Sequence, residues 1–353
     1  NLVNGKPLVY LEGVSNRTVT YAGQLILINC DKINIENLNL SNTDPSIQLW
    51  GTNNTKITNN NITNNLRGIW LTGSSNTTIV GNNITANKWE GIGLDGSSKN
   101  NVVGNNIANN EDAVHLQRSS NCNRIDGNNI ANNTNGIVLC DSSNNSFSGN
   151  NITANNYCSI YVLGSSNNSI SGNNITANSW YGIVLDNSSN NRIYHNNFVR
   201  NTKQVYSYAS LNVWDDYYPS GGNYWSNYNG TDSDYDSIGD ASYAIDDNNQ
   251  DNYPLMGMFS SFNTSYGYAV DFISNSSISH LSFNVSLIEV YPPEATLTLN
   301  VSGVTDTEGF VRVCIPRILI NGSYVIRFDG EIITNTTYPQ VRELPCSNET
   351  YEY

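Results

Sequence analysis

A short asparagine-rich motif recurs through much of the chain at intervals of about 23 residues. It reads NNNIT at 59–63, GNNIT at 81–85, GNNIA at 104–108 and 127–131, GNNIT at 149–153 and 172–176, and HNNFV at 195–199. A fixed period of this length is the signature of a solenoid. In a solenoid each repeat forms one coil and buries its apolar side chains against the next coil.

Each repeat contains three short apolar segments separated by Asn, Gly and Ser. The Asn-Asn-Ile motif is one, a Gly-Ile-x-Leu run such as 182–185 is the second, and a segment centred on residues such as Ile79 is the third. None has helical periodicity, and period-two alternation sends Ile and Leu inward. The sequence therefore predicts an all-β fold, a right-handed parallel β-helix of about eight or nine coils. Equivalent Asn side chains of successive coils are expected to form amide ladders.

The rest of the chain divides by composition. Residues 1–29 are interpreted as an N-terminal cap or entry coil, residues 30–203 as the β-helix repeats, and residues 204–255 as a closing segment. From 256 to 353 the repeat is absent, and alternating apolar segments such as 269–273 are separated by turns. This pattern predicts a C-terminal antiparallel β-sandwich.

The net charge and the N-glycosylation sequons limit the possible partners and the cellular compartment. The formal net charge is −14, with only 16 Lys and Arg, which argues against nucleic acids and anionic membranes as partners. No apolar run reaches the roughly 20 residues of a membrane span. N-glycosylation sequons indicate an extracellular or cell-surface protein carrying N-linked glycans. Chance produces sequons in Asn-rich repeats, but they persist after 255. The chain has about twenty sequons, and the candidate glycosylation sites among them are Asn16, Asn61, Asn76, Asn83, Asn132, Asn144, Asn151, Asn167, Asn174, Asn187, Asn229, Asn263, Asn275, Asn284, Asn300, Asn321, Asn335 and Asn348.

The cysteines fit such a location without establishing it. Cys314 and Cys346 fall in the C-terminal domain and are expected to form a disulfide. Cys30, Cys122, Cys140 and Cys158 lie in the repeats without metal-ligand spacing, and we interpret them as small buried apolar residues, with their pairing left open.

The repeats and the segment NYWSNYNGTDSDYDSIGDASYAIDDNNQDNYPL at 223–255 resemble the NosD-like group of right-handed β-helix proteins, within the wider class of carbohydrate-binding and sugar-hydrolase β-helices. The resemblance covers residues 1–255 and implies an archaeal cell-surface protein. No copper is expected despite the family's name, because the chain has 3 His and 2 Met. His115, His195 and His280 show no ligand spacing.

An acidic loop in the closing segment is a candidate calcium site. Asp232, Asp234, Asp236 and Asp240 follow the pattern D-x-D-x-D-S-x-G-D. Carboxylates at alternate positions before a glycine turn can surround Ca²⁺ with oxygen atoms. The loop lacks the bidentate Glu of an EF-hand, and the alternative is a solvated acidic turn.

The outward positions of the Gly-Ile-x-Leu strands hold weak catalytic candidates. These are Glu90, Asp95, Asp112 and His115. A glycosidase needs two carboxylates roughly 5 to 9.5 Å apart, which Glu90 and Asp112 on adjacent coils could provide. No acid–base cluster is evident, so the chain is more simply a non-enzyme. Aromatic residues precede the same strands, either to stack on sugars or to cover the coil corner: Trp89, Tyr157, Trp180 and Tyr181.

Two functions are compatible with these features. The first is a glycosylated structural or adhesive surface protein that assembles with itself into a filament or layer. The second is a carbohydrate-binding or polysaccharide-cleaving β-helix protein. No sequon begins between 83 and 132, and this window is the expected contact with another copy, although chance loss of two Thr is the alternative. The densest charges of the repeats lie in this window, at Glu111, Asp112, His115, Arg118, Arg124 and Asp126.

Overall fold

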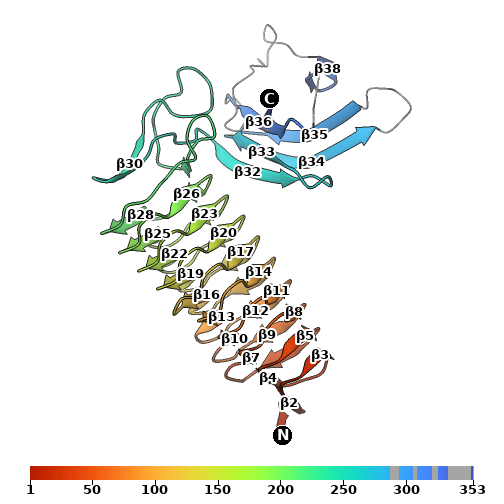
Figure 1. The fold of residues 1–353 in the computed structure, drawn as a ribbon. Coiled ribbons are helices and arrows are strands. Elements are labelled where there is room, and N and C mark those ends of the chain that lie inside the picture. The colour runs from red at the N-terminus through yellow and green to blue at the C-terminus, as the bar shows by residue number, and fades with distance from the viewer. Residues whose placement is uncertain (287–293, 305–307, 320–324, 333–350, 353) are drawn as a thin grey trace. The chain divides into compact units, whose positions relative to one another are not determined.

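The computed structural model describes residues 1–286, 294–304, 308–319, 325–332 and 351–352 (Figure 1). These residues form strands and turns without a helix. The chain divides into two compact units. The first comprises Asn1–Trp214, Trp225–Asn227 and Ala244–Asp251, and the second Asp215–Tyr224, Tyr228–Tyr243 and Asn252–Tyr353. The closing segment predicted at 204–255 is thus shared between them.

The first unit is a parallel β-helix with three sheets, which confirms the predicted fold (Figure 1). Sheet 1 contains β1 (Leu2–Val3), β2 (Lys6–Glu12), β4 (Gln24–Ile28), β7 (Ile47–Trp50), β10 (Ile69–Thr72), β13 (Glu90–Asp95), β16 (Asp112–Gln117), β19 (Asn135–Cys140), β22 (Cys158–Leu163), β25 (Tyr181–Asp186) and β28 (Lys203–Tyr208). Sheet 2 contains β3 (Ser15–Val19), β5 (Asp31–Glu36), β8 (Lys56–Thr58), β11 (Thr78–Val80), β14 (Asn101–Val103), β17 (Arg124–Asp126), β20 (Ser146–Ser148), β23 (Ser169–Ser171) and β26 (Arg192–Tyr194). Sheet 3 contains β6 (Asn39–Ser41), β9 (Asn61–Thr63), β12 (Asn83–Thr85), β15 (Asn106–Ala108), β18 (Asn129–Ala131), β21 (Asn151–Thr153), β24 (Asn174–Thr176), β27 (Asn197–Val199) and β29 (Tyr224–Trp225).

The core of the β-helix consists of the apolar residue at the centre of each short strand. In sheet 3, Ile84 pairs with Ile107, and in sheet 2, Ile79 pairs with Val102. All four side chains are fully buried, as alternation predicts. Because the repeat keeps equivalent residues in register, each sheet extends the same apolar ladder coil by coil.

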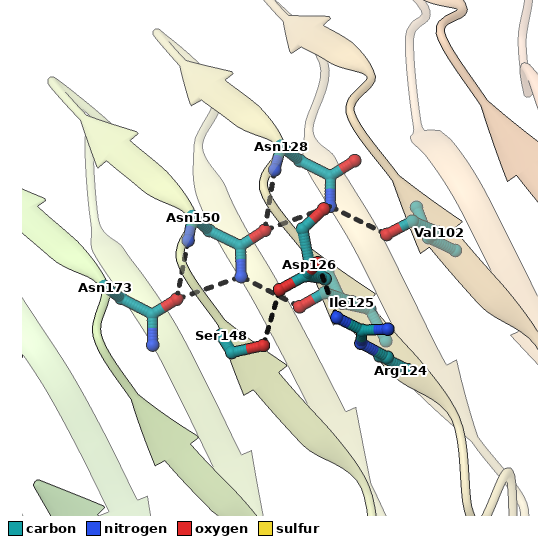
Figure 2. Close-up of polar contacts among 8 residues, drawn as sticks. All are labelled: Val102, Arg124, Ile125, Asp126, Asn128, Ser148, Asn150 and Asn173. Atoms are coloured by element: carbon teal, nitrogen blue, oxygen red, sulfur yellow. Dashed lines mark hydrogen bonds and ion pairs between the residues drawn. The ribbon is translucent and has the colours of Figure 1, made fainter. Parts of the chain in front are cut away.

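Buried asparagines run beside this core as amide ladders (Figure 2). The Asn150 side-chain oxygen accepts hydrogen bonds from the backbone N–H and the side-chain amide of Asn128, both at 3.0 Å. The side-chain amide of Asn150 donates to the carbonyl of Ile125 at 2.9 Å and to the side-chain oxygen of Asn173 at 2.9 Å. These contacts satisfy backbone groups that the turns would otherwise leave buried and unpaired.

Residues 1–29 form a coil of the β-helix. Strand β2 pairs in parallel with β4, and β3 pairs in parallel with β5. Strand β1 folds back antiparallel on β2, so the first edge of sheet 1 carries a short hairpin. A short paired edge of this kind limits edge-to-edge association.

Aromatic rings close the other end of the β-helix core. The ring of Trp225 stacks on Phe198 at a centroid distance of 4.3 Å, and Trp214 lies 6.0 Å from Trp225. Trp214 and Trp225 are each 1% exposed. The indole N–H of Trp225 donates to the carboxylate of Asp251 at 2.8 Å.

The second unit contains the antiparallel sheets expected after residue 256. The largest of them orders β32 (Met258–Asn263), β33 (Ala269–Ser274), β36 (Val311–Pro316) and β39 (Tyr351–Glu352), and β34 (Ser277–Ser286) pairs with β35 (Glu294–Ser302). The hairpin of β30 (Tyr243–Asp246) with β31 (Asn249–Asp251) belongs to the first unit except for Tyr243. The second unit also contains the hairpin of β37 (Arg327–Phe328) with β38 (Glu331–Ile332). Ile238, Leu255 and Ile273 form its buried apolar cluster.

Candidate functional site

The outward side chains of sheet 1 form continuous ladders across the coils. In the middle ladder Trp70 pairs with Gly93, Gly93 with His115 and His115 with Val138, because the parallel strands are in register. We call the outward side of β7 to β28 the outer face of sheet 1. It carries most of the residues to which the sequence pointed as catalytic or sugar-binding.

Four aromatic rings cluster toward one end of this face, and we call them the aromatic strip: Tyr157, Trp180, Tyr181 and Tyr206. The ring centroids of Tyr157 and Trp180 lie 5.9 Å apart, and those of Tyr181 and Tyr206 lie 5.6 Å apart. Trp180 is 57% exposed and Tyr206 is 44% exposed. The rings therefore pack in tilted and T-shaped pairs on the surface and leave much of their area open to solvent. Sequence reasoning identified three of them but missed Tyr206, which alternation along β28 places outward.

A second aromatic group surrounds Arg67 near the other end of the face. Its guanidinium lies 5.0 Å from the ring centroid of Trp70 and 4.5 Å from that of Trp89. It also pairs with Asp44 at 3.0 Å and Glu90 at 3.2 Å. Two carboxylates and two aromatic rings already contact this guanidinium. The cluster therefore stabilises the coil corner.

The weak catalytic carboxylates are each engaged by a basic side chain. Glu90 pairs with Arg67, Asp95 pairs with Arg118 at 2.9 Å, and Asp112 pairs with His115 at 3.0 Å. Glu90 and Asp112 do lie opposite each other on neighbouring strands. Each carboxylate is therefore held by a basic partner, and a catalytic role for either stays a prediction.

His115 has a distinctive electrostatic environment on this face. Burial of the ring opposes protonation, but Asp112 and the Cys140 thiol outweigh it and raise the pKa of His115 to about 10. At neutral pH the ring is therefore an imidazolium held against a carboxylate. Asp112 is itself fixed, since the side-chain amide of Asn135 donates to its other oxygen at 2.8 Å.

The acidic loop brings three of its four predicted ligands together. One carboxylate oxygen each of Asp232, Asp234 and Asp236 lies within 4.8 Å of the others. Burial raises the pKa of Asp232, against the opposing effect of backbone N–H donors from Ser237 and Asp236. Asp240 lies apart from this group.

The carboxylate of Asp240 accepts hydrogen bonds from the hydroxyls of Thr231 at 3.0 Å and Ser233 at 2.7 Å. The bond from the Ser233 hydroxyl is the largest of the effects that lower the pKa of Asp240. This side chain therefore shapes the loop from outside the carboxylate group.

The NosD family model, described as periplasmic copper-binding protein, matches residues 8–147 and 90–230 of the chain. Together these matches span more than half of it. The chain belongs to the NosD family.

Copper does not fit the donor groups of this NosD-family chain. Within the described residues, Asp232, Asp234 and Asp236 are the one group of three His, Cys, Asp or Glu side chains whose ligand atoms all lie within 4.8 Å of one another. Its donors are all carboxylate oxygens, which suit hard cations, whereas copper prefers imidazole and sulfur ligands.

Solved structures similar to this NosD-family chain are parallel β-helix proteins of low identity. The periplasmic alginate epimerase AlgG matches with 21% identity and a TM-score of 0.47, over 52% of this chain and 49% of AlgG. DFA-IIIase from Arthrobacter chlorophenolicus A6, without its lid and in complex with GF2, has 14% identity and a TM-score of 0.44, over 57% of this chain and 54% of the enzyme. The tailspike of E. coli bacteriophage HK620, in complex with a pentasaccharide, has 10% identity and a TM-score of 0.47, over 61% of this chain and 47% of the tailspike. The chain spans about half the length of these structures. A search of curated proteins finds no match.

The predicted contact window is divided between two faces of the β-helix. Glu111, Asp112, His115 and Arg118 lie on or beside β16 of sheet 1, whereas Arg124 and Asp126 lie on β17 of sheet 2. Arg124 and Asp126 also pair with each other at 2.8 Å (Figure 2). Contact with another copy through this window stays a prediction.

Sequon asparagines lie in two kinds of position. Asn61, Asn83, Asn151 and Asn174 point outward from sheet 3, and the amide of Asn83 donates to the oxygen of Asn61 at 2.8 Å. Exposed asparagines in left-handed turns are Asn16, Asn76, Asn132, Asn144, Asn167 and Asn187. Asn229, Asn263, Asn275, Asn284 and Asn300 are exposed as well, whereas Asn321, Asn335 and Asn348 lie outside the described residues. Occupancy stays a prediction.

Two of the cysteines differ from the interpretation as buried apolar residues. Cys30 and Cys158 are buried, but Cys122 is exposed and Cys140 is half-buried. Cys140 follows the inward Leu139, so alternation turns its thiol outward. The disulfide of Cys314 stays a prediction, because its expected partner Cys346 lies outside the described residues. The described part of this NosD-family chain includes no helix long and apolar enough to cross a membrane.

Proposed function

We propose that this NosD-family chain is an extracytoplasmic adhesive protein that binds polysaccharide through its aromatic strip. The exposure of four clustered rings on the outer face of sheet 1 carries the proposal. Clustered exposed rings usually mark an interaction site, because apolar area left in water costs free energy that a partner can recover. Flat aromatic rings suit the apolar faces of sugar rings.

The arrangement of the strip favours a polymer over a single sugar. Tyr157, Trp180 and Tyr206 come from three successive coils, and neighbouring strands lie roughly 4.8 Å apart. A chain of similar sugar units offers a repeating face to such a series. Lys203, whose ammonium lies 5.8 Å from the Tyr181 ring centroid, adds a hydrogen-bond donor at the same end.

The adhesive part of the proposal rests on compartment and architecture. The family description is of a periplasmic protein, and exposed sequons are compatible with a location outside the cytoplasm. A β-helix is a rigid support that holds binding groups at a fixed spacing. Glycosylation of the outward asparagines and assembly into a filament or layer belong to this same proposal.

Replacing Trp180 with alanine should weaken polysaccharide binding about tenfold, which corresponds to about 1.4 kcal/mol. The reason is the loss of the most exposed ring of the strip and of its two ring contacts. Affinity electrophoresis through gels containing alginate, polygalacturonate or mixed-linkage β-glucan would measure the effect and select the polymer.

The matched control is Trp50→Ala. Trp50 is 55% exposed on the same face but lies outside the aromatic strip. It should bind like the parent protein. Retardation that is equal for the parent, Trp180→Ala and Trp50→Ala variants on every polymer would refute binding through the strip.

We also propose that Ca²⁺ binds Asp232, Asp234 and Asp236. Their clustered oxygens suit a hard divalent cation, which would relieve the mutual repulsion of the carboxylates. Saturation at a hundredfold excess over the dissociation constant stabilises a fold by about 2.7 kcal/mol. Chelation should therefore lower the melting temperature by several degrees in a calorimetric scan.

The chelator effect should vanish in Asp234→Asn and persist in Asp240→Asn, whose side chain lies outside the carboxylate group. It should also shrink as pH falls, because Ca²⁺ binds the ionised carboxylates and the pKa of Asp232 is already raised by burial. Equal melting curves with and without chelator at pH 7 would contradict calcium binding.

A further inference from the structure

Cys140 lies on the outer face of sheet 1 in contact with a fixed histidine–carboxylate pair. The nitrogen Nδ1 of His115 is 3.0 Å from an Asp112 oxygen, with side-chain exposures of 18% and 15%. Cys140 occupies the next strand, two residues beyond Val138, which is the register partner of His115. The Cys140 thiol interacts with the ring of His115, and both ring nitrogens are shielded from solvent.

Hydrogen bonds along the neighbouring ladder hold this pair in place. The thiol of Cys158 donates to the side-chain oxygen of Asn135 at 3.3 Å, and the amide of Asn135 donates to Asp112 at 2.8 Å. Asp112 is therefore held by Asn135 on one oxygen and His115 on the other. The order of groups is carboxylate, imidazole, thiol, which is the arrangement that activates a sulfur nucleophile.

We propose that Cys140 is a reactive thiol, positioned by His115 and Asp112, that takes small disulfides and related soft electrophiles. This site is independent of polysaccharide binding by the aromatic strip. A cationic ring beside the sulfur stabilises the thiolate, which is the reactive form of cysteine.

The expected reaction is thiol–disulfide exchange. The Cys140 thiolate attacks one sulfur of a small disulfide, the disulfide's own bond breaks, and a mixed disulfide forms on Cys140. The other half leaves as a thiolate and takes a proton from solvent. His115 carries its proton while the thiolate is present, because Asp112 and Cys140 raise its pKa to about 10.

Other charged groups around the ring are already engaged or distant from the sulfur. On β13, Glu90 and Asp95 pair with Arg67 and Arg118. On β22, Cys158 and Tyr161 have pKa values raised chiefly by burial, so both are neutral at pH 7. His115 is therefore the cation that can support a thiolate at Cys140, with the exposed Asp141 next in the chain as an opposing charge.

The chain supplies its own control thiol in Cys122. Cys122 is exposed in a turn, whereas Cys140 is half-buried beside His115. If accessibility alone set the rate, Cys122 should react faster. If stabilisation of the thiolate sets the rate, Cys140 should react faster. Cys30 and Cys158 are buried and should stay unlabelled in the folded protein.

The test is the rate of labelling of the full chain by 4,4′-dithiodipyridine, with the labelled cysteines located by peptide mass mapping. At pH 7 Cys140 should react about tenfold faster than Cys122, because the cationic ring of His115 lies beside its sulfur. His115→Gln should remove this advantage, shift the pH–rate profile of Cys140 to higher pH and leave Cys122 unchanged. A melting curve checks that the variant is folded. Cys140 reacting no faster than Cys122 in the parent protein, or an unaltered profile in folded His115→Gln, would overturn the proposal.

Discussion

Asn150→Ala should destabilise the β-helix by about 4 kcal/mol, although it removes only a small polar side chain. Asn150 is 1% exposed, and its side chain takes part in four hydrogen bonds (Figure 2). Truncation leaves the backbone N–H of Asn128 and the carbonyl of Ile125 without these partners. Each buried group left unpaired costs about 1–3 kcal/mol. Denaturant unfolding followed by circular dichroism would measure the loss.

The adjacent residue provides the control. Asn151 points outward from β21, and its amide makes one exposed hydrogen bond, to Asn129 at 2.9 Å. Asn151→Ala should cost less than about 1 kcal/mol, because water replaces that bond. Both proteins should be made without glycosylation, since Asn151 begins a sequon. Equal destabilisation by the two variants would show that the buried ladder does not stabilise the fold.

The contrast between these neighbours also explains why the fold was predictable. Alternation places Asn151 opposite in direction to the inward Ile152, and it places Asn150 on the same side as Ile152. Because the repeat keeps the register from coil to coil, the equivalent residues of each coil point in the same directions. The spacing of the motif therefore predicts the apolar ladders, the number of sheets and the amide ladders.

The site was less predictable because it depends on side-chain directions at turns and between strands. Asp232, Asp234 and Asp236 converge as their alternate spacing suggests, whereas Asp240 turns toward the hydroxyls of Thr231 and Ser233. Spacing alone cannot distinguish a carboxylate that points into a loop from one that accepts hydrogen bonds at its edge.

Gly93 illustrates a further limit. A side chain there would meet the ring of Trp70, whose Cε3 atom lies 2.2 Å from the position of a Cβ. The glycine is thus required by an aromatic residue on the preceding coil, a contact that becomes visible only when the register of β10 and β13 is known. Likewise, the pairing of each candidate carboxylate with Arg67, Arg118 or His115 needed the coil-to-coil geometry.

Trp225→Ala should destabilise the first unit by about 4 kcal/mol, the range expected for truncating a buried tryptophan. The Trp225 ring stacks on Phe198 with an interplanar angle of 8°, so its removal would open the last coil's core to water. Because each coil is supported by its neighbours, a defect at the end of a solenoid lets unfolding start there. Denaturant unfolding and hydrogen exchange of the amides near Phe198 would measure both consequences.

Two further variants separate packing from hydrogen bonding at Trp225. Trp225→Phe keeps a stacking ring but loses the N–H donor to Asp251, which is fully buried, and should cost about 1–3 kcal/mol. Trp50→Ala removes an exposed indole from the same unit and should cost less than about 1 kcal/mol. The loss of stability should be largest for Trp225→Ala, smaller for Trp225→Phe and smallest for Trp50→Ala. This order is expected if stacking contributes more than the hydrogen bond does. If Trp225→Ala unfolded at the same denaturant concentration as Trp50→Ala, the aromatic stack would not be what closes the core, and the buried amide ladders would have to hold the last coil by themselves.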